Sequence, residues 1–194
     1  MVERPILFNG EMVRAILDGQ KTVTRRAIKP GFPSSVKEVL PYVAYPASWM
    51  PRDPESPDEA WEEQVRICPY GQPGDQLWVR ETFRDARTAG AGRVLYKASG
   101  DVACGWKPSI HMPRNCSRIQ LEVTAVRVER LHGISNEQCI AEGCKGGHGS
   151  IPGYIYNATP QEHFRHVWES AGGDYFANPW VWVVEFNRLE VAHG

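Results

Sequence analysis

Nine of the fifteen prolines in this 194-residue chain fall between residues 27 and 73. Proline fixes its own backbone angle and lacks an amide donor, so this segment cannot form long helices or central strands. The segment also holds six aromatic residues: Phe32, Tyr42, Tyr45, Trp49, Trp61 and Tyr70. Aromatic side chains are unusual in a solvated linker. We therefore predict an ordered, irregular insertion at about 27–73 that packs on the body of the protein, and a lid is one role open to it.

Regular secondary structure is predicted on both sides of this insertion. Asn9 is a helix cap, apolar residues then recur at helical spacing, and Gly19 is a stop signal. Two capping boxes, at 135–138 and 159–162, begin further helices. The helices are predicted near 11–18, 136–142 and 160–171, and the strands at 6–8, 21–26, 76–83, 93–97, 117–131 and 180–189.

The last two predicted strands have the clearest patterns. Trp180, Trp182, Val184 and Phe186 alternate with other residues, so they share one face of a strand. In residues 117–131 the alternation changes phase near Val126, which predicts a β-bulge or two strands. Antiparallel-looking strands with few helices favour an α+β class, a small β-barrel with flanking helices. We expect one domain over residues 1–194, with the insertion and a glycine-rich loop at about 143–158.

Composition argues against several functional classes. Twenty-two Lys and Arg residues against 23 Asp and Glu give a net charge of −1, whereas a protein that holds duplex nucleic acid by bulk charge is clearly basic. No apolar stretch is long enough to span a membrane, and no secretory signal is evident. Five cysteines without a tight framework indicate reduced thiols. We expect a cytoplasmic protein with no membrane partner; the sequence is silent on oligomeric state.

The segment from Gly19 to Arg26 has the most unusual local chemistry, with three cations and two hydroxyls within six residues. Neighbouring positive charges lower the pKa of a lysine, so a neutral Lys21 could accept a proton from Thr24 and make its hydroxyl a nucleophile. Residues 21 and 24 point to opposite faces of a regular strand, so this pairing requires Lys21 in the preceding turn or at a bulge. The alternative is a solvated basic strand edge.

Other segments offer further candidates. Glu142 directly precedes Gly143, the residue that is expected to end the helix. The helix dipole disfavours a negative charge at this end, which would favour the protonated form of Glu142 and suit it to act as a general acid. The alternative is an ordinary exposed glutamate. A planar ligand could bind residues 104–116, although a polar loop around one buried tryptophan fits equally well. This stretch contains Trp106, Lys107, Ser109, His111 and Arg114. The spacing of Cys139, Cys144 and His148, with Cys116 as a fourth ligand, matches a zinc site only loosely, so no metal is expected.

Residues 19–26, Gly-Gln-Lys-Thr-Val-Thr-Arg-Arg, resemble the G-x-K-x-x-x-x-R signature of ASCH-domain proteins. Residues 68–82, 107–113 and 178–182 resemble the larger, often phage- or prophage-encoded members. The resemblance spans most of the chain and is most specific around Lys21 and Gly74. It implies a PUA-like β-barrel, the ASCH fold, with a pocket suited to a nucleobase or nucleoside.

Some small members of the ASCH family are amidohydrolases that remove the acyl group from N4-acetylcytidine and related N4-acylcytosines, using a Lys-Thr-Glu triad. The resemblance implies that Lys21 and Thr24 are the first two members of the triad. It implies Glu142 as the third by its place after the central strands. Arg26 matches the signature arginine and, with Glu81, is a candidate for substrate binding. Glu81 follows the strand after Gly74 and is the substitute acid if Glu142 points away.

We therefore expect a metal-independent amidohydrolase without a cofactor, acting on N4-acetylcytidine or a related N4-acylcytosine nucleoside. Lys21 would accept the proton of Thr24, Glu142 would protonate the leaving amine, and Arg26 or backbone amides would stabilise the oxyanion. The alternatives are an RNA-binding PUA-like module and a ribonuclease. The phosphate track would then comprise Lys21, Arg25, Arg26, Lys107 and Arg114. The insertion and the glycine-rich loop set this chain apart from the small members, so the preferred acyl group is left open.

Overall fold

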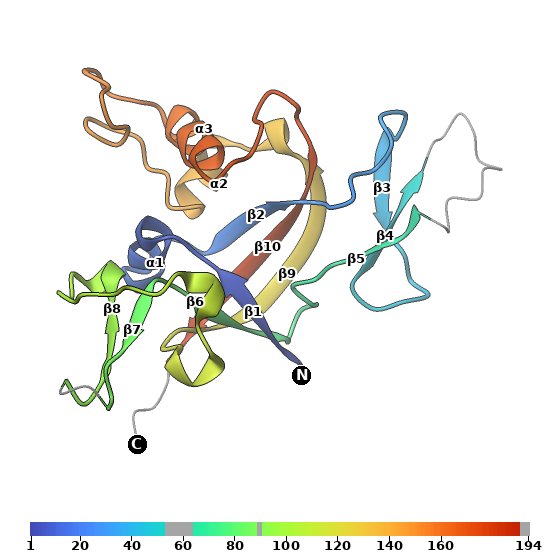
Figure 1. Cartoon of the computed structure of the whole chain (residues 1–194). Helices are drawn as coiled ribbons and strands as arrows, with labels where there is room; N and C mark the ends of the chain where they lie inside the picture. The colour runs from blue at the N-terminus through green and yellow to red at the C-terminus, as the bar shows by residue number, and fades with distance from the viewer. Residues whose placement is uncertain (53–63, 89–90, 191–194) are drawn as a thin grey trace.

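The computed structural model describes residues 1–52, 64–88 and 91–190 (Figure 1). The strands are β1 (Glu3–Leu7), β2 (Val23–Ala27), β3 (Glu38–Pro41), β4 (Ser48–Arg52), β5 (Arg66–Ile67), β6 (Gln76–Arg80), β7 (Phe83–Asp85), β8 (Val94–Tyr96), β9 (Gln120–Arg130) and β10 (Trp180–Leu189). The helices are α1 (Gly10–Leu17), α2 (Asn136–Ala141) and α3 (Pro160–Ser170). Short 3-10 turns cover Lys97–Ser99, Ser109–His111, Arg114–Cys116 and Leu131–Gly133.

Five strands form the central sheet, in the order β1-β6-β9-β10-β2. β1 and β6 pair in parallel, and the other neighbours are antiparallel. In the described part of the chain, β1 and β2 are therefore the two edges of this sheet and do not pair with each other. The predicted α+β class is confirmed, whereas closure of the sheet into a PUA-like barrel stays a prediction.

Strand β10 is buried on both faces, which places the sheet between two apolar cores. Trp182, Val184 and Phe186 belong to the first core, which includes the apolar face of α1. Val181 and Val183 belong to the second core, which includes residues of α2 and α3. Figure 1 shows α2 beside α3, and the two helices are in contact. The predicted alternation in 180–189 is confirmed, but the burial of the opposite face of the strand was not predicted.

The phase change predicted in 117–131 is a β-bulge within one strand. Opposite β10, the pairing steps from Ala125, which faces Glu185, to Val123, which faces Phe186. Thr124 is the extra residue of the bulge. Val123 and Val126 consequently both pack in the first core, although they are three positions apart and a regular strand would send them to opposite faces.

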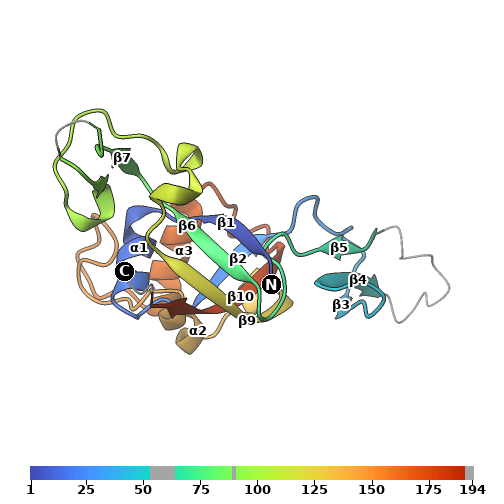
Figure 2. The same cartoon turned by 90° about the horizontal axis from the view of Figure 1, so that it is seen from below.

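The proline-rich insertion forms its own three-stranded antiparallel sheet, β3-β4-β5. It packs on the body through Trp49 of β4, whose ring centroid lies 5.1 Å from that of Trp182. Figures 1 and 2 both show this small sheet standing apart from the three helices. Residues 53–63 of the predicted insertion, including Trp61, lie outside the described residues.

The structure also shows how the predicted strand at 76–83 and the predicted glycine-rich loop are formed. The predicted strand at 76–83 is two strands, because β7 leaves the central sheet and pairs with β8. The glycine-rich loop after α2 is closed by backbone hydrogen bonds in both directions between Gly147 and Ala158. Among the described helices, none combines the length and the apolar character that crossing a bilayer requires.

Candidate active site

A pocket of 540 Å³ opens along the free edge of β2. Its lining includes polar residues of β2 and α2 and aromatic residues from other elements: Thr24, Arg25, Arg26, Glu142, Tyr70, Phe164 and Trp168. A second pocket of 310 Å³ shares Glu142 and Cys144 with the first. Among the described residues β2 pairs only with β10, and residues 24–27 of β2 line the pocket.

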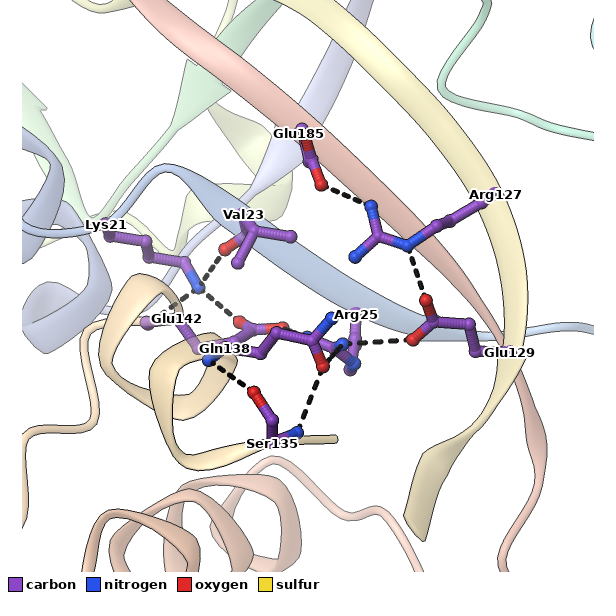
Figure 3. Close-up of polar contacts among 9 residues, drawn as sticks. All are labelled: Lys21, Val23, Arg25, Arg127, Glu129, Ser135, Gln138, Glu142 and Glu185. Atoms are coloured by element: carbon purple, nitrogen blue, oxygen red, sulfur yellow. Dashed lines mark hydrogen bonds and ion pairs between the residues drawn. The ribbon is translucent and has the colours of Figure 1, made fainter. Parts of the chain in front are cut away.

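Lys21 lies in the turn between α1 and β2, as its predicted pairing with Thr24 requires. Gly19 adopts the left-handed conformation that ends α1, with φ at 69°, and the Lys21 amide donates to Ala15 O at 3.0 Å. The Lys21 side chain has no exposed surface. Its Nζ donates to Val23 O at 2.8 Å, to Glu142 O at 2.9 Å and to Glu142 Oε2 at 2.5 Å (Figure 3). These acceptors take all three protons of an ammonium group.

Glu142 is the C-cap of α2, which confirms the predicted helix end. The helix is fixed at its other end by the predicted capping box of Ser135 and Gln138. Gly143 follows in the left-handed region at φ 92°, and a Cβ there would lie 3.0 Å from the Cβ of Ala15. A glycine at this position therefore turns the chain and lets α1 approach closely, which brings the Glu142 side chain onto Lys21.

The Lys21–Glu142 pair is largely buried: the Lys21 side chain has no exposed surface, and that of Glu142 is 5% exposed where it lines the pockets. Burial lowers the pKa of Lys21, the negative charge of Glu142 opposes this, and Arg26 adds a further lowering. The direction agrees with the sequence prediction, but burial outweighs the neighbouring cations as its cause. In a medium of low polarity an ion pair gains little over its neutral form. A proton that moves from Nζ to Oε2 across 2.5 Å leaves an amine base beside a carboxylic acid, with no change in total charge.

Thr24 lies in the same pocket and is 1% exposed. It faces Val184 across the sheet, whereas Arg25 faces Val183, so the two side chains leave β2 on opposite faces. The protons of Lys21 Nζ are directed to Val23 and Glu142 rather than to the Thr24 hydroxyl. Lys21 can therefore accept the Thr24 proton only after it has passed one of its own to Glu142.

The two residues predicted to bind substrate have different locations. Arg26 lines the pocket; its Nη2 donates to Leu7 O at 2.5 Å, and its guanidinium lies 5.1 Å from the centre of the Phe8 ring. Glu81 is 1% exposed and accepts from Arg118 through both oxygens, at 2.9 and 3.0 Å. Glu81 lines neither of the two pockets. Since Glu142 faces Lys21, we assign the acid to Glu142, and a role for Glu81 in substrate binding stays a prediction.

Arg25 contributes to the site in a way that the sequence reasoning missed. The phosphate-track alternative needs Arg25 on the surface, yet its side chain has no exposed surface. Its Nη2 donates to Glu129 Oε2 at 3.1 Å and to Gln138 Oε1 at 2.9 Å, and its Nη1 lies 3.5 Å from Glu142 Oε1 (Figure 3). Gln138 and Glu142 are four residues apart and so lie on one helix face. That spacing is the signal that could have linked them.

The other candidate clusters do not join this site. Residues 104–116 line neither pocket, and Arg114 pairs with Glu3 at 2.6 and 2.9 Å. Cys139 and Cys144 are buried in the second core. Within residues 1–52, 64–88 and 91–190, no three His, Cys, Asp or Glu side chains come together in a group able to hold a metal ion.

Comparison with known proteins finds similarity to solved structures only. No family model matches the chain, and no curated protein matches its sequence. An ASCH domain from Lactobacillus crispatus JV V101 is similar to it with a TM-score of 0.42 and 11% identity, over 96% of this chain and 79% of that one. Protein EF3133 from Enterococcus faecalis V583, of family DUF984, is similar with a TM-score of 0.42 and 11% identity, over 100% and 84% of the two chains.

Proposed function

We propose that this protein is a metal-independent amidohydrolase that removes the acyl group from N4-acetylcytidine or a related N4-acylcytosine nucleoside. The observation that carries the proposal is the buried Lys21–Glu142 pair, with an N–O distance of 2.5 Å. Its Glu142 lines the pocket together with Thr24, whereas Lys21 lines neither pocket and acts through Glu142. The resemblance of residues 19–26 to the ASCH signature, and the PUA-like barrel that it implies, point to the same class of substrate.

The proposed acylation step begins within the ion pair. Lys21 passes a proton to Glu142 and becomes a neutral base. It then takes the proton of the Thr24 hydroxyl as the Thr24 oxygen attacks the acyl carbonyl. Glu142 gives its proton to the exocyclic nitrogen, the carbon–nitrogen bond breaks, and the free cytosine amine leaves. Arg26 or backbone amides stabilise the oxyanion, an interaction typically worth about 3 kcal/mol per donor.

Deacylation returns the protein to its starting state. Glu142, now a carboxylate, takes a proton from water as the water oxygen attacks the Thr24 ester. The acyl group leaves as a carboxylic acid, and the Thr24 oxygen recovers a proton from Lys21. Glu142 then passes the proton it took from water to Lys21, which restores the ion pair. A direct attack by water that Glu142 activates is a variant with the same overall reaction, the addition of one water to the amide bond.

The pocket has the chemistry expected for a nucleoside. Its volume of 540 Å³ falls within the range of about 300–1,000 Å³ common for small-molecule sites. Trp168 and Tyr70 offer aromatic surface for a planar base, and Lys29 adds a positive charge to the lining. The competing RNA-binding interpretation has less support, because the side chains of Lys21 and Arg25 have no exposed surface for a phosphate.

An ultraviolet assay on a panel of substrates tests the proposal. Purified protein is incubated with N4-acetylcytidine, N4-acetylcytosine and cytidines that carry longer acyl groups on N4, with N6-acetyladenosine as the control base. We expect release of the free cytosine derivative and no effect of a metal chelator. A labelled RNA, incubated in parallel over a range of salt concentrations, distinguishes the alternatives. Salt-sensitive RNA binding or RNA cleavage, without deacylation of any cytosine compound, would replace the proposal.

A further inference from the structure

Two cations contact Glu142, one at each carboxylate oxygen. Lys21 Nζ lies 2.5 Å from Oε2, and Arg25 Nη1 lies 3.5 Å from Oε1. Both cationic side chains have no exposed surface, so water screens neither charge. Lys21 exchanges a proton with Glu142 in the proposed reaction, whereas Arg25 keeps its charge at any working pH. Arg25 therefore acts on Glu142 only through its position and its fixed charge.

Arg25 is held in place by groups outside the pocket. Its Nη2 is shared between Glu129 Oε2 at 3.1 Å and Gln138 Oε1 at 2.9 Å. Glu129 also accepts from Arg127, which in turn contacts Glu185 (Figure 3). The chain of contacts thus crosses β2, β9 and β10 before it ends at the pocket.

This arrangement is costly as a purely structural device. Arg25 Nε is buried without a hydrogen-bond partner among the described residues. A buried donor without a partner is destabilising, and an apolar side chain would fill the same space without that cost. Departures of this kind from good packing are expected at functional sites.

We propose that Arg25 is a positioning residue for the amidohydrolase reaction: it fixes the Glu142 carboxylate against Lys21 and, through its charge, favours the state in which Glu142 has given up its proton. This inference rests on the proposed function. Glu142 returns to that state when it protonates the leaving amine, so the charge of Arg25 favours bond cleavage rather than substrate binding, although it opposes the earlier proton transfer from Lys21 to Glu142. Glu129 moderates the effect, because it takes up part of the Arg25 charge.

In the active form of the Lys21–Glu142 pair, one ionisable proton is shared: it lies either on Lys21 Nζ or on the Glu142 carboxylate. A nearby positive charge makes each proton of the pair easier to lose. Removal of Arg25 should therefore move both pH limits of activity upwards, and removal of the Glu129 charge should move both downwards, each by about one unit. Other ionisable groups around the pair stay in place in these variants: Arg26, Cys144 and Cys139, and Glu11 and His163 on the neighbouring helices.

The test compares Arg25→Met, Arg25→Lys and Glu129→Gln with the wild type. Arg93→Met, which removes a cation paired with Asp101 in the β7–β8 region, is the control. Two readouts are taken: the pH profile of kcat and KM on N4-acetylcytidine, and a carbon NMR titration of the Lys21 and Glu142 side chains. We expect Arg25→Met to lower kcat by about 10- to 100-fold with little change in KM, and to shift both readouts upwards.

Arg25→Lys keeps the charge and should restore the wild-type pH limits, and Glu129→Gln should shift them downwards. Glu129→Gln leaves Arg25 in place, so it tests the inference even if Arg25→Met does not fold. Equal titrations in the wild type and all folded variants would overturn the inference, whatever the activity. If the NMR titrations of Arg25→Met and Glu129→Gln shift in opposite directions but the wild-type protein deacylates none of the substrates, the proposed function is overturned and the effect of Arg25 on the pair stands.

Discussion

Breaking the Lys21–Glu142 pair should cost the protein a large part of its stability. Glu142→Gln leaves an ammonium group without exposed surface facing only neutral acceptors, a loss of about 3 to 5 kcal/mol for a buried pair. Burial already lowers the pKa of Lys21, so in this variant the lysine can release its proton, which limits the loss to about 3 kcal/mol. Lys21→Met removes the same attraction and leaves the carbonyls of Val23 and Glu142 without their donor, and we expect a similar loss.

Urea unfolding followed by tryptophan fluorescence gives the free energy of unfolding of each variant. Because each single variant forfeits the same interaction, the double variant Lys21→Met/Glu142→Gln should lose about 2 kcal/mol less than the sum of the two. The matched control is Arg93→Met, which breaks an ion pair whose arginine is 61% exposed, so the expected loss is no more than about 1 kcal/mol. A loss below about 1 kcal/mol in each single variant, together with a double variant that loses the sum of the two, would refute a buried, coupled pair.

Three further predictions follow from burial and pairing elsewhere in the molecule. Glu81→Gln should lower the free energy of unfolding by about 2 kcal/mol, because its partner Arg118 is partly exposed and this limits the loss. The variant should leave kcat/KM on N4-acetylcytidine unchanged, and a loss of activity would place Glu81 in the site. Trp49→Ala should cost about 3 kcal/mol in urea unfolding, because it removes the ring that packs the insertion on Trp182, and an unchanged midpoint would show that the insertion is not docked. Burial raises the pKa of the Cys144 thiol from 9.0 to about 12. The stability that the buried neutral thiol contributes is therefore complete below pH 9 and is lost as the pH rises towards 12. Cys144→Ala should flatten the decline in the free energy of unfolding over this pH range, and an unchanged decline would count against burial of the thiol.

Sequence patterns predicted the elements with strong local signals. The capping boxes that begin α2 and α3 and the alternation along β10 specify local geometry by themselves, and all three are present. The split of residues 76–83 into β6 and β7 was missed, because no glycine or proline marks the point where the chain leaves the sheet. Long-range pairing decides that break, and a single sequence does not contain it.

The candidate site was predictable in its residue types and only partly in its contacts. The turn position of Lys21 is one of the two arrangements, a turn or a bulge, that pairing with Thr24 was predicted to require, because residues 21 and 24 point to opposite faces of a regular strand. The direct Lys21–Glu142 contact spans 121 positions along the chain, and the resemblance to ASCH proteins suggested it where spacing could not. The burial of Arg25 depends on Glu129 and Gln138, which come from β9 and α2, so local composition favoured the wrong, exposed location.

We propose that Lys21, Thr24 and Glu142 together hydrolyse an N4-acyl amide bound in the pocket beside β2. The most direct test of this proposal is the turnover of N4-acetylcytidine by the wild type, Lys21→Ala and Thr24→Ala, each confirmed as folded by circular dichroism. We expect cytidine release by the wild type and a loss of at least about 100-fold in each variant. Cytidine release at near wild-type rates by both variants would contradict it.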